Sequence, residues 1–299
     1  MSTNNRNSIA PLLVIVGQTA TGKSALALDL AERLGGEIIC ADSRTVYRDM
    51  NIGTAKPSAA DQARVPHWGL DLASPAERFT VADFKVYANQ AIREIQSRGM
   101  LPIMVGGSGL YIDAVLYDFQ LRPVAEPGLR AELEALSVDQ LQARLAALGL
   151  PLPENARNPR YLMRAIETAD APAGTGGKSE LRPNTVILGL EQDMVIIEER
   201  IAARVEQMVA DGLVAEVTLL SNKYGWEAQA MQAPGYKAFR DYITGTKTLD
   251  EAKAEFVRND RALAKRQKTW FRRNKSIHWL TTEDKLAEAV DFATTLLDT

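Results

Sequence analysis

Cysteine is nearly absent from this 299-residue chain, which has Cys40 and no other cysteine. A disulfide framework needs pairs of cysteines and a thiolate zinc site needs several, so both are excluded. The chain has only two histidines, His67 and His278, and they lie far apart in the sequence, so we expect structural roles for them. The sequence therefore offers no metal centre built from cysteine and histidine.

Long hydrophobic runs are also missing. No stretch approaches the roughly 20 apolar residues that a membrane-spanning helix needs, and residues 1–10 lack the hydrophobic segment of a secretion signal. Apolar residues make up 46% of the chain and charged residues 24%, which is ordinary for a soluble globular protein. We expect a cytoplasmic, monomeric protein with no membrane partner and with one large or two modest domains.

The chain has no overall excess of positive charge, since its formal net charge is −3. That balance argues against a protein that coats nucleic acid indiscriminately. The basic residues are nevertheless concentrated in one predicted helix, where a single acid, Asp260, stands among them. The basic face of this helix is either exposed only to solvent or binds nucleic acid. The basic residues of this segment are Arg258, Arg261, Lys265, Arg266, Lys268, Arg272, Arg273 and Lys275.

A phosphate-binding signature follows the first apolar run. Residues 12–16 are apolar and β-branched enough for a buried strand, and residues 17–24 match the pattern G-x-x-x-x-G-K-S/T. In such a loop the backbone N–H groups surround phosphate oxygens, the lysine adds a charge and the hydroxyl offers an oxygen to Mg²⁺. A helix predicted over 25–34 points its positive end at the same place and stops at Gly35. The expected ligands of a phosphate group are Gly17, Gln18, Thr19, Ala20, Thr21, Gly22, Lys23 and Ser24, with Ser24 on the metal.

Further apolar runs predict strands over residues 37–41, 101–105 and 185–190, and residues 277–280 are a candidate edge strand. Helical patterns over 82–98, 195–212 and 249–274 alternate with them, which is typical of a doubly wound parallel sheet. Residues 123–183 contain helical patterns at 127–136 and 138–148, no strand, and a glycine-rich loop at 170–179. The predicted fold is therefore α/β: a P-loop NTPase-like core over 1–122, an all-helical insertion over 123–183, and a return to the core with the basic helix over 184–299.

A carboxylate follows the second predicted strand at Asp42, nineteen residues after Lys23. Small P-loop kinases keep near this position the acid that receives the acceptor's proton, so Asp42 should face the phosphate loop. The alternative is that Asp42 only caps the next turn, with Ser43 as a partner. The third strand ends in Gly106 and Gly107, where most P-loop hydrolases place a water-positioning acid. The glycines indicate a close approach to the backbone instead of hydrolysis.

Five blocks of this sequence together resemble the tRNA dimethylallyltransferase family, and their order along nearly the whole chain is the same. They are the phosphate loop at 17–24, Cys40-Ala-Asp-Ser-Arg-Thr-Val-Tyr-Arg-Asp-Met-Asn-Ile-Gly-Thr-Ala-Lys-Pro57, Val105-Gly-Gly-Ser108, Gln232-Ala-Pro-Gly-Tyr236 and Ala264-Lys-Arg-Gln-Lys-Thr-Trp-Phe-Arg272.

The resemblance implies transfer of a dimethylallyl group from dimethylallyl diphosphate to the exocyclic amine of adenosine 37, in tRNAs that read codons beginning with U. Diphosphate is the leaving group, and the P-loop amides, Lys23 and Mg²⁺ on Ser24 would stabilise its charge. Asp42 matches the residue that accepts the amine's proton. The target base would flip out of its stack to reach this site. The family's contacts with the tRNA anticodon stem-loop map here onto Asp42, Ser43, Arg44, Thr45, Ser108, Arg130, Arg160, Arg164, Gln232, Arg258, Arg261 and Lys265.

Four positions depart from the family's pattern. Thr45 stands where glutamine is usual, Pro234 where isoleucine is common, and Asp260 and Ala262 flank Arg261 in place of threonine and a polar residue. Thr45 is shorter and would weaken a hydrogen bond to the flipped base. Asp260 is expected to put a negative charge near the RNA. These departures bear on tRNA preference and efficiency and leave the reaction class unchanged.

Three other functions compete with this interpretation. The phosphate loop is also the nucleotide-binding, ATP-binding signature of small-molecule kinases, but no arginine-rich lid follows the third strand. An adenylate isopentenyltransferase acts on free nucleotides, whereas the long insertion and the basic helix favour RNA. A non-enzymatic RNA-binding module leaves the pairing of Lys23 with Asp42 unexplained.

Overall fold

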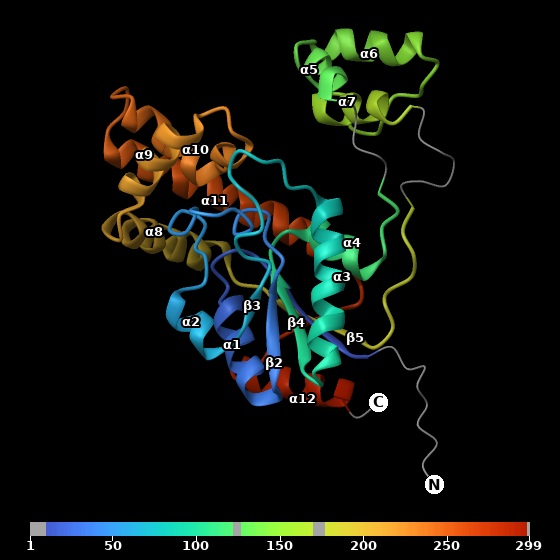
Figure 1. The fold of residues 1–299 in the computed structure, drawn as a ribbon, viewed down its shortest axis with the longest axis vertical. Helices are drawn as coiled ribbons and strands as arrows, with labels where there is room; N and C mark the ends of the chain where they lie inside the picture. Colours follow the sequence, from blue (N-terminus) through green and yellow to red (C-terminus); the bar gives the residue numbers. More distant parts are fainter. Residues whose placement is uncertain (1–9, 122–126, 170–176, 298–299) are drawn as a thin grey trace. The chain divides into compact units, whose positions relative to one another are not determined.

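The computed structural model describes residues 10–121, 127–169 and 177–297. Within these ranges, six parallel strands form one sheet in the order β3-β2-β4-β1-β5-β6 (Figure 1). The strands predicted from apolar runs are confirmed, the edge strand included, whereas β3 was not predicted because it is only two residues long. The strands are β1 (Leu12–Gly17), β2 (Gly36–Cys40), β3 (His67–Trp68), β4 (Leu101–Gly106), β5 (Thr185–Leu190) and β6 (Ile277–Trp279).

Helices surround this sheet, and the long helices predicted from periodicity are confirmed. Five further helices of the core were not predicted, namely α2, α4, α9, α10 and α12. The core helices are α1 (Lys23–Leu34), α2 (Ala59–Arg64), α3 (Val81–Ser97), α4 (Gly109–Leu116), α8 (Met194–Ala210), α9 (Leu213–Tyr224), α10 (Pro234–Ile243), α11 (Leu249–Phe271) and α12 (Lys285–Leu297), with a 3₁₀ helix η1 (Gln229–Gln232). None of the helices in the described ranges is both long and apolar enough to cross a membrane.

Strand β1 is completely buried because both faces of the sheet are covered. On one face, Leu13 and Ile15 pack in a cluster with residues of α1 and α12. Helix α3 contacts β2 and β4. The β1–β2 and β3–β4 crossovers run in opposite directions along the sheet. Because both crossovers are right-handed, their helices α1 and α3 lie on opposite faces of the sheet. This layered order fits a doubly wound P-loop core.

The carboxyl ends of β1, β2 and β4 meet at one edge of the sheet. At this edge the chain passes very close to itself: a Cβ atom on Gly106 would lie 2.0 Å from the carbonyl oxygen of Ala41. Only glycine fits there. The loops that follow β1, β2 and β4 are therefore held together where ligands bind in this architecture.

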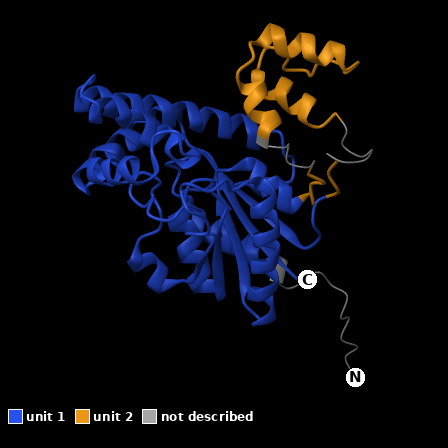
Figure 2. Ribbon diagram, turned by 45° about the horizontal axis from the view of Figure 1, so that its top comes forward, with its two compact units in different colours: residues 1–116, 181–299 blue, residues 117–180 orange. Residues whose placement is uncertain are grey.

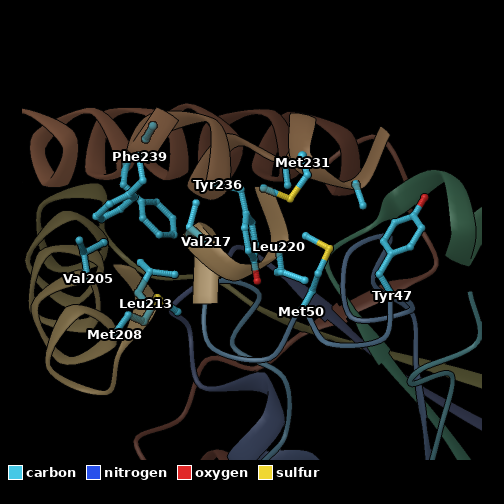
Figure 3. Close-up of a cluster of buried hydrophobic side chains, with 14 of the residues drawn as sticks. Tyr47, Met50, Val205, Met208, Leu213, Val217, Leu220, Met231, Tyr236 and Phe239 are labelled. Carbon is cyan, nitrogen blue, oxygen red and sulfur yellow. The ribbon is translucent and has the colours of Figure 1, made fainter. Parts of the chain in front are cut away.

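The helices after β5 form a second hydrophobic cluster beside the sheet. Figure 3 shows Tyr236 and Phe239 of α10 packed among residues of α8 and α9, with Met50 from the loop after β2. Tyr236 and Phe239 are fully buried. This cluster fixes α11 against the core, because Phe256 and Ala264 of α11 belong to it.

The insertion is a separate compact unit, Tyr117–Glu180, drawn in orange in Figure 2. Composition placed the insertion at 123–183. Its helices are α5 (Pro127–Glu134), α6 (Val138–Ala147) and α7 (Pro159–Glu167), of which α7 was not predicted. They pack around a small core that includes Leu133, Leu141 and Leu162, all fully buried. Most of the predicted glycine-rich loop, residues 170–176, lies outside the described residues.

Candidate active site

The phosphate loop joins β1 to α1 and has the backbone of an anion-binding nest. Ala20 and Gly22 adopt positive φ angles of 62° and 93°. The amide groups of residues 20–25 donate no hydrogen bond to any other described part of the chain. A run of such free N–H groups at a helix N-terminus attracts anions. The loop can therefore bind a phosphate group with its backbone alone.

Lys23 lies at the first position of α1 and donates a hydrogen bond to the carbonyl oxygen of Gln18. Burial lowers the pKa of Lys23, the charge of Asp42 opposes that shift and the charge of Arg204 adds to it, and the resulting pKa is about 8. Lys23 is therefore protonated below about pH 8 and is sensitive to any anion that enters the site. This is a suitable cation for a ligand that carries negative charge.

Asp42 comes two residues after β2 and lines the same cavity as Lys23 and Ser24. Its Oδ1 accepts a hydrogen bond of 2.7 Å from the amide of Arg44, so the capping role considered from sequence is real. Its second oxygen accepts no hydrogen bond from the described residues. Asp42 thus has one oxygen that fixes its side chain and another that is available for proton transfer. The cavity also includes Thr45 and Thr54 from the loops after β2, and Val105 and Gly107 from β4 and its following loop.

Two buried side-chain polar atoms in the described residues have no hydrogen-bond partner, Thr45 Oγ1 and Arg204 Nε, and both residues line this cavity. Unpaired buried polar groups are uncommon in folded proteins because they cost free energy. Their location in one cavity indicates that a polar ligand completes it. Thr45 is only 5% exposed, so its hydroxyl has little access to solvent.

Arg204 was missed in the sequence and lies on α8, which follows β5. Its Nη1 donates to Thr19 Oγ1 at 3.1 Å, and Nη2 donates to Asp260 Oδ2 at 2.6 Å. One turn earlier on the same helix, Arg200 donates to the carbonyl oxygen of Ala20 at 3.2 Å. Two arginines spaced i, i+4 on the helix after a core strand were the available signal. They place positive charge beside the phosphate loop.

Asp260 corrects an expectation. The sequence placed its charge near the RNA, but Asp260 is only 8% exposed and is paired with Arg204. Burial raises the pKa of Asp260, and Arg204 opposes that shift. The side chain points inward because Asp260 lies on the face of α11 that also buries Ala264 and Phe271. Asp260 therefore lies on the buried face of this helix.

Gln267, one heptad further on, is the second inward polar residue of α11. Its Oε1 accepts a hydrogen bond of 2.7 Å from the amide of Thr19, and its Nε2 donates one of 3.1 Å to the carbonyl oxygen of Gly107. A Cβ atom on Gly107 would lie 2.2 Å from Gln267 Nε2, so a larger residue there would displace the Gln267 amide. The glycines at the end of β4 were predicted to admit a close approach, and the groups that approach are Ala41 at Gly106 and Gln267 of α11 at Gly107.

A second anchor holds the loop after β2. Glu216 of α9 accepts hydrogen bonds from the amides of Asn51, Ile52 and Gly53, at 2.8–3.0 Å, and from the hydroxyl of Tyr236. Burial and the charge of Glu216 raise the pKa of Tyr236. The blocks at 40–57 and 232–236 that carry the family resemblance therefore meet in space. Thr54 and Pro57, which line the cavity, follow this anchored turn.

The residues expected beside the flipped base are close to one another. Ser43 donates its amide to Ser108 Oγ at 3.0 Å, which joins the loops after β2 and β4. Arg44 is half-buried, and its side chain has no hydrogen-bond partner among the described residues. Thr45 and Asp42 line the cavity itself. Gln232, in contrast, is an exposed residue of η1 that donates to the carbonyl oxygen of Trp226 at 2.5 Å.

The basic helix predicted from sequence is confirmed as α11, and its exposed face is basic. Arg258, Lys265 and Arg266 are exposed and form no ion pair with the described residues. Arg261 pairs with Glu198 at 2.8 Å, and Lys268 pairs with Glu191 at 2.5 Å. The unpaired charges are the ones available to a polyanion.

The arginines of the insertion differ in their partners. Arg130 forms ion pairs with Glu134 at 2.8 Å and with the buried Glu167 at 2.7 Å, so it joins α5 to α7. Arg164 also pairs with Glu167, at 3.3 Å. Arg160 is exposed at the start of α7. Arg130 therefore has a structural role within this unit.

Each histidine contacts an oxygen atom within the chain. His67 Nδ1 contacts the carbonyl oxygen of Val65 at 2.8 Å, and His278 Nε2 lies 3.0 Å from Glu288 Oε1. The described residues contain no cluster of three or more histidine, cysteine or acidic side chains that would hold a metal ion by themselves. Any metal at the phosphate loop would need oxygens from its ligand.

Comparison with known proteins gives consistent matches. The model of the family described as IPP transferase matches residues 45–274, and that of isopentenyl transferase matches residues 10–65. The chain is 41% identical over 282 residues to tRNA dimethylallyltransferase 1 of Citrifermentans bemidjiense, which covers 90% of this chain and 91% of the relative.

Two crystal structures resemble the whole fold. The full-length tRNA isopentenylpyrophosphate transferase of Bacillus halodurans has a TM-score of 0.74 at 38% identity, and 97% of each chain is covered. The tRNA delta(2)-isopentenylpyrophosphate transferase of Staphylococcus epidermidis has a TM-score of 0.72 at 31% identity, with 97% of this chain and 100% of that one covered.

Proposed function

The chain belongs to the IPP transferase family, and on that premise we propose that it transfers a dimethylallyl group from dimethylallyl diphosphate to an adenosine of tRNA. The proposed acceptor is the exocyclic amine of adenosine 37, in tRNAs that read codons beginning with U. The observation that carries the proposal is one cavity lined both by the phosphate loop and by Asp42. Such a cavity brings a diphosphate leaving group and a proton acceptor together.

The donor's diphosphate is proposed to bind at the free amides of residues 20–25. Lys23 supplies a positive charge, and Arg204 has a buried Nε that needs an acceptor. Negative charge grows on the diphosphate as the allylic carbon–oxygen bond breaks, so these preorganised donors stabilise the transition state more than the ground state. The diphosphate leaves with the electron pair of that bond.

The family implies Mg²⁺, and the side chains present are compatible with it. Ser24 is exposed beside the loop, and its hydroxyl has no hydrogen-bond partner among the described residues. Mg²⁺ in phosphate sites commonly takes one or two protein oxygens, with the rest from phosphate and water. We propose Ser24 as the protein ligand. When bound, the ion would neutralise part of the charge on the diphosphate.

Asp42 is proposed to act as the general base. Adenine's exocyclic amine is a weak nucleophile, because its lone pair is delocalised into the ring. As the amine nitrogen forms a bond to the allylic carbon, one of its protons passes to the free oxygen of Asp42. The other oxygen, Oδ1, accepts the hydrogen bond from the backbone amide of Arg44. The balance is complete: one carbon–nitrogen bond forms, one carbon–oxygen bond breaks, and the proton stays on the carboxylate until it exchanges with water.

The tRNA is proposed to bind through the basic face of α11 and through Arg160 and Arg164 of the insertion. Arg258, Lys265 and Arg266 are exposed on α11 and unpaired within the described chain, which suits contacts with phosphates. The inner face of the same helix contacts the phosphate loop through Gln267. The target base must leave its stack to reach a cavity at the sheet edge, so base flipping is part of the proposal.

Mass spectrometry of nucleosides tests the function. Purified protein is incubated with unmodified tRNA, Mg²⁺ and dimethylallyl diphosphate, and the tRNA is then digested. We expect one modified adenosine whose mass has increased by a dimethylallyl group, with inorganic diphosphate released in equal amount. The reaction should need no ATP. Phosphorylation of a small acceptor from ATP, with no prenylated adenosine, would support the kinase interpretation instead.

A further inference from the structure

The ion pair between Asp260 and Arg204 connects α11 to the phosphate loop. Asp260 Oδ2 lies 2.6 Å from Arg204 Nη2, and Arg204 Nη1 lies 3.1 Å from Thr19 Oγ1. The side chain of Asp260 is 11% exposed. The three residues thus form a chain of contacts that begins inside the helical cluster and ends on the loop.

Of the three nitrogens of the guanidinium, Nε is the one without a partner among the described residues. Arg204 Nε is buried and donates to nothing in the described structure, while Arg204 lines the cavity together with Lys23 and Ser24. A guanidinium is a rigid planar fork, so fixing two of its nitrogens also fixes the direction of the third. Thr19 and Asp260 fix the two Nη atoms. The orientation of Nε is therefore set by these two contacts.

We propose that Asp260 is a positioning residue for the donor: it holds Arg204 so that Nε donates to the diphosphate bound at the phosphate loop. This inference rests on the proposed function only in assigning a diphosphate to that loop. Asp260 does not touch the donor itself. It acts through Arg204, and the contact is durable because the Asp260 carboxylate, 11% exposed, has little water as an alternative partner.

The same two helices offer a matched control. Glu206 of α8 pairs with Lys253 of α11 at 3.0 Å, and the Glu206 side chain is 63% exposed. This pair crosses the same interface as Asp260–Arg204, but neither residue lines the cavity. If Asp260 only held the helices together, Glu206→Ala and Asp260→Ala would differ in stability alone. A positioning role predicts that only Asp260 variants change diphosphate binding.

Three variants separate position from charge. Asp260→Ala removes the contact, Asp260→Asn keeps an acceptor of the same shape without the charge, and Asp260→Glu keeps the charge but moves the oxygens outward. Binding of inorganic diphosphate with Mg²⁺ is measured by titration calorimetry without tRNA. The Michaelis constants for dimethylallyl diphosphate and tRNA are measured separately, and thermal unfolding confirms that each variant is folded.

We expect Asp260→Ala to weaken diphosphate binding by about tenfold, the usual loss of one charge-assisted contact, and to raise the donor KM in parallel. The dissociation constant of diphosphate for Asp260→Asn should stay within about threefold of the parent value, and Asp260→Glu should bind diphosphate more weakly than Asp260→Asn. The tRNA KM should not change, and Glu206→Ala should match the parent. If Asp260→Ala does not fold, the relative diphosphate affinities of Asp260→Asn and Asp260→Glu still test the proposal.

Unchanged or tighter diphosphate binding in folded Asp260→Ala would overturn the proposal, and so would an Asp260→Glu variant that binds as well as the parent while Asp260→Asn does not. The outcome is separable from the proposed function. Prenylation of tRNA with no effect of Asp260 on the donor removes this inference alone. Diphosphate binding in the expected order without any prenylation removes the proposed reaction and leaves the positioning role.

Discussion

Gln267 Oε1 lies 2.7 Å from the amide nitrogen of Thr19, so helix α11 holds the phosphate loop directly. Gln267→Ala should raise the donor KM by about tenfold, because the loop loses an acceptor on one side and the carbonyl of Gly107 loses a donor. Gln267→Glu keeps an acceptor for Thr19 but adds a negative charge near the diphosphate, so its donor KM should rise further. Steady-state kinetics at saturating tRNA measure both. A donor KM that is the same in all three proteins would contradict the role of this contact.

Diphosphate binding should depend on the protonation of Lys23. Burial lowers its pKa to about 8 in the free protein. An anion favours the charged form and raises that pKa, so affinity is greatest below about pH 8 and falls as the pH rises toward the higher pKa of the complex. Calorimetric dissociation constants from pH 6.5 to 9.5 measure the effect.

Two variants of Lys23 control for the titration of diphosphate itself. Lys23→Arg stays charged over this range, so the loss of affinity near pH 8 should disappear. Lys23→Ala should lose turnover, since it removes charge stabilisation of the leaving group. If the parent and Lys23→Arg have the same pH dependence, Lys23 does not titrate in the site. A Lys23→Ala protein with nearly normal turnover would remove the donor from this loop.

Removing the unpaired charges of α11 should weaken tRNA binding without slowing the chemical step. Arg258→Ala with Lys265→Ala should reduce the salt dependence of binding by about one log–log unit for each lost phosphate contact. Lys268 is a poor choice for this test because it is paired with Glu191. Arg33→Ala is the matched control and should leave the slope unchanged, because Arg33 is exposed in the last turn of α1 and forms no ion pair with the described part of the chain. An unchanged slope in the double variant would show that this face is only solvated.

Glu216→Ala should destabilise the protein and loosen the loop after β2. The change leaves the amides of residues 51–53 and the buried hydroxyl of Tyr236 without their acceptor, which should cost about 2–4 kcal/mol. Tyr236→Phe removes one of these bonds and should cost less, about 1 kcal/mol. Urea unfolding measures both. A Glu216→Ala protein as stable as the parent would show that water replaces the carboxylate at no cost.

Local sequence order was enough to predict the phosphate loop and Asp42. The buried run at 12–16 and the glycines at 17, 22 and 35 fix a strand, a loop and a helix without any distant contact. Asp42 was predicted because it directly follows an apolar strand, and the carboxyl ends of parallel strands meet. Both therefore rest on short-range patterns and on one general property of the fold.

The cavity residues Arg204 and Gln267, and the buried Asp260 that pairs with Arg204, were not predicted, because their contacts join segments very distant in sequence. Gln267 and Thr19 are 248 residues apart, and Arg204 and Thr19 are 185 apart. Dense basic charge drew attention to the outer face of α11, whereas the informative signal was on its inner face. Two polar side chains seven residues apart on an otherwise apolar face indicate a buried polar contact.

The rate of the chemical step in Asp42→Asn is the most direct test of the proposed mechanism. Asparagine keeps the shape of the side chain and the acceptor for the amide of Arg44, but it cannot take a proton from adenine. Single-turnover kinetics with saturating tRNA and dimethylallyl diphosphate should show a step slower by about 10²–10⁴-fold, with tRNA binding retained. Asp42→Ala should be at least as slow. An Asp42→Asn protein that reacts within a few-fold of the parent would mean that the proton leaves by another route.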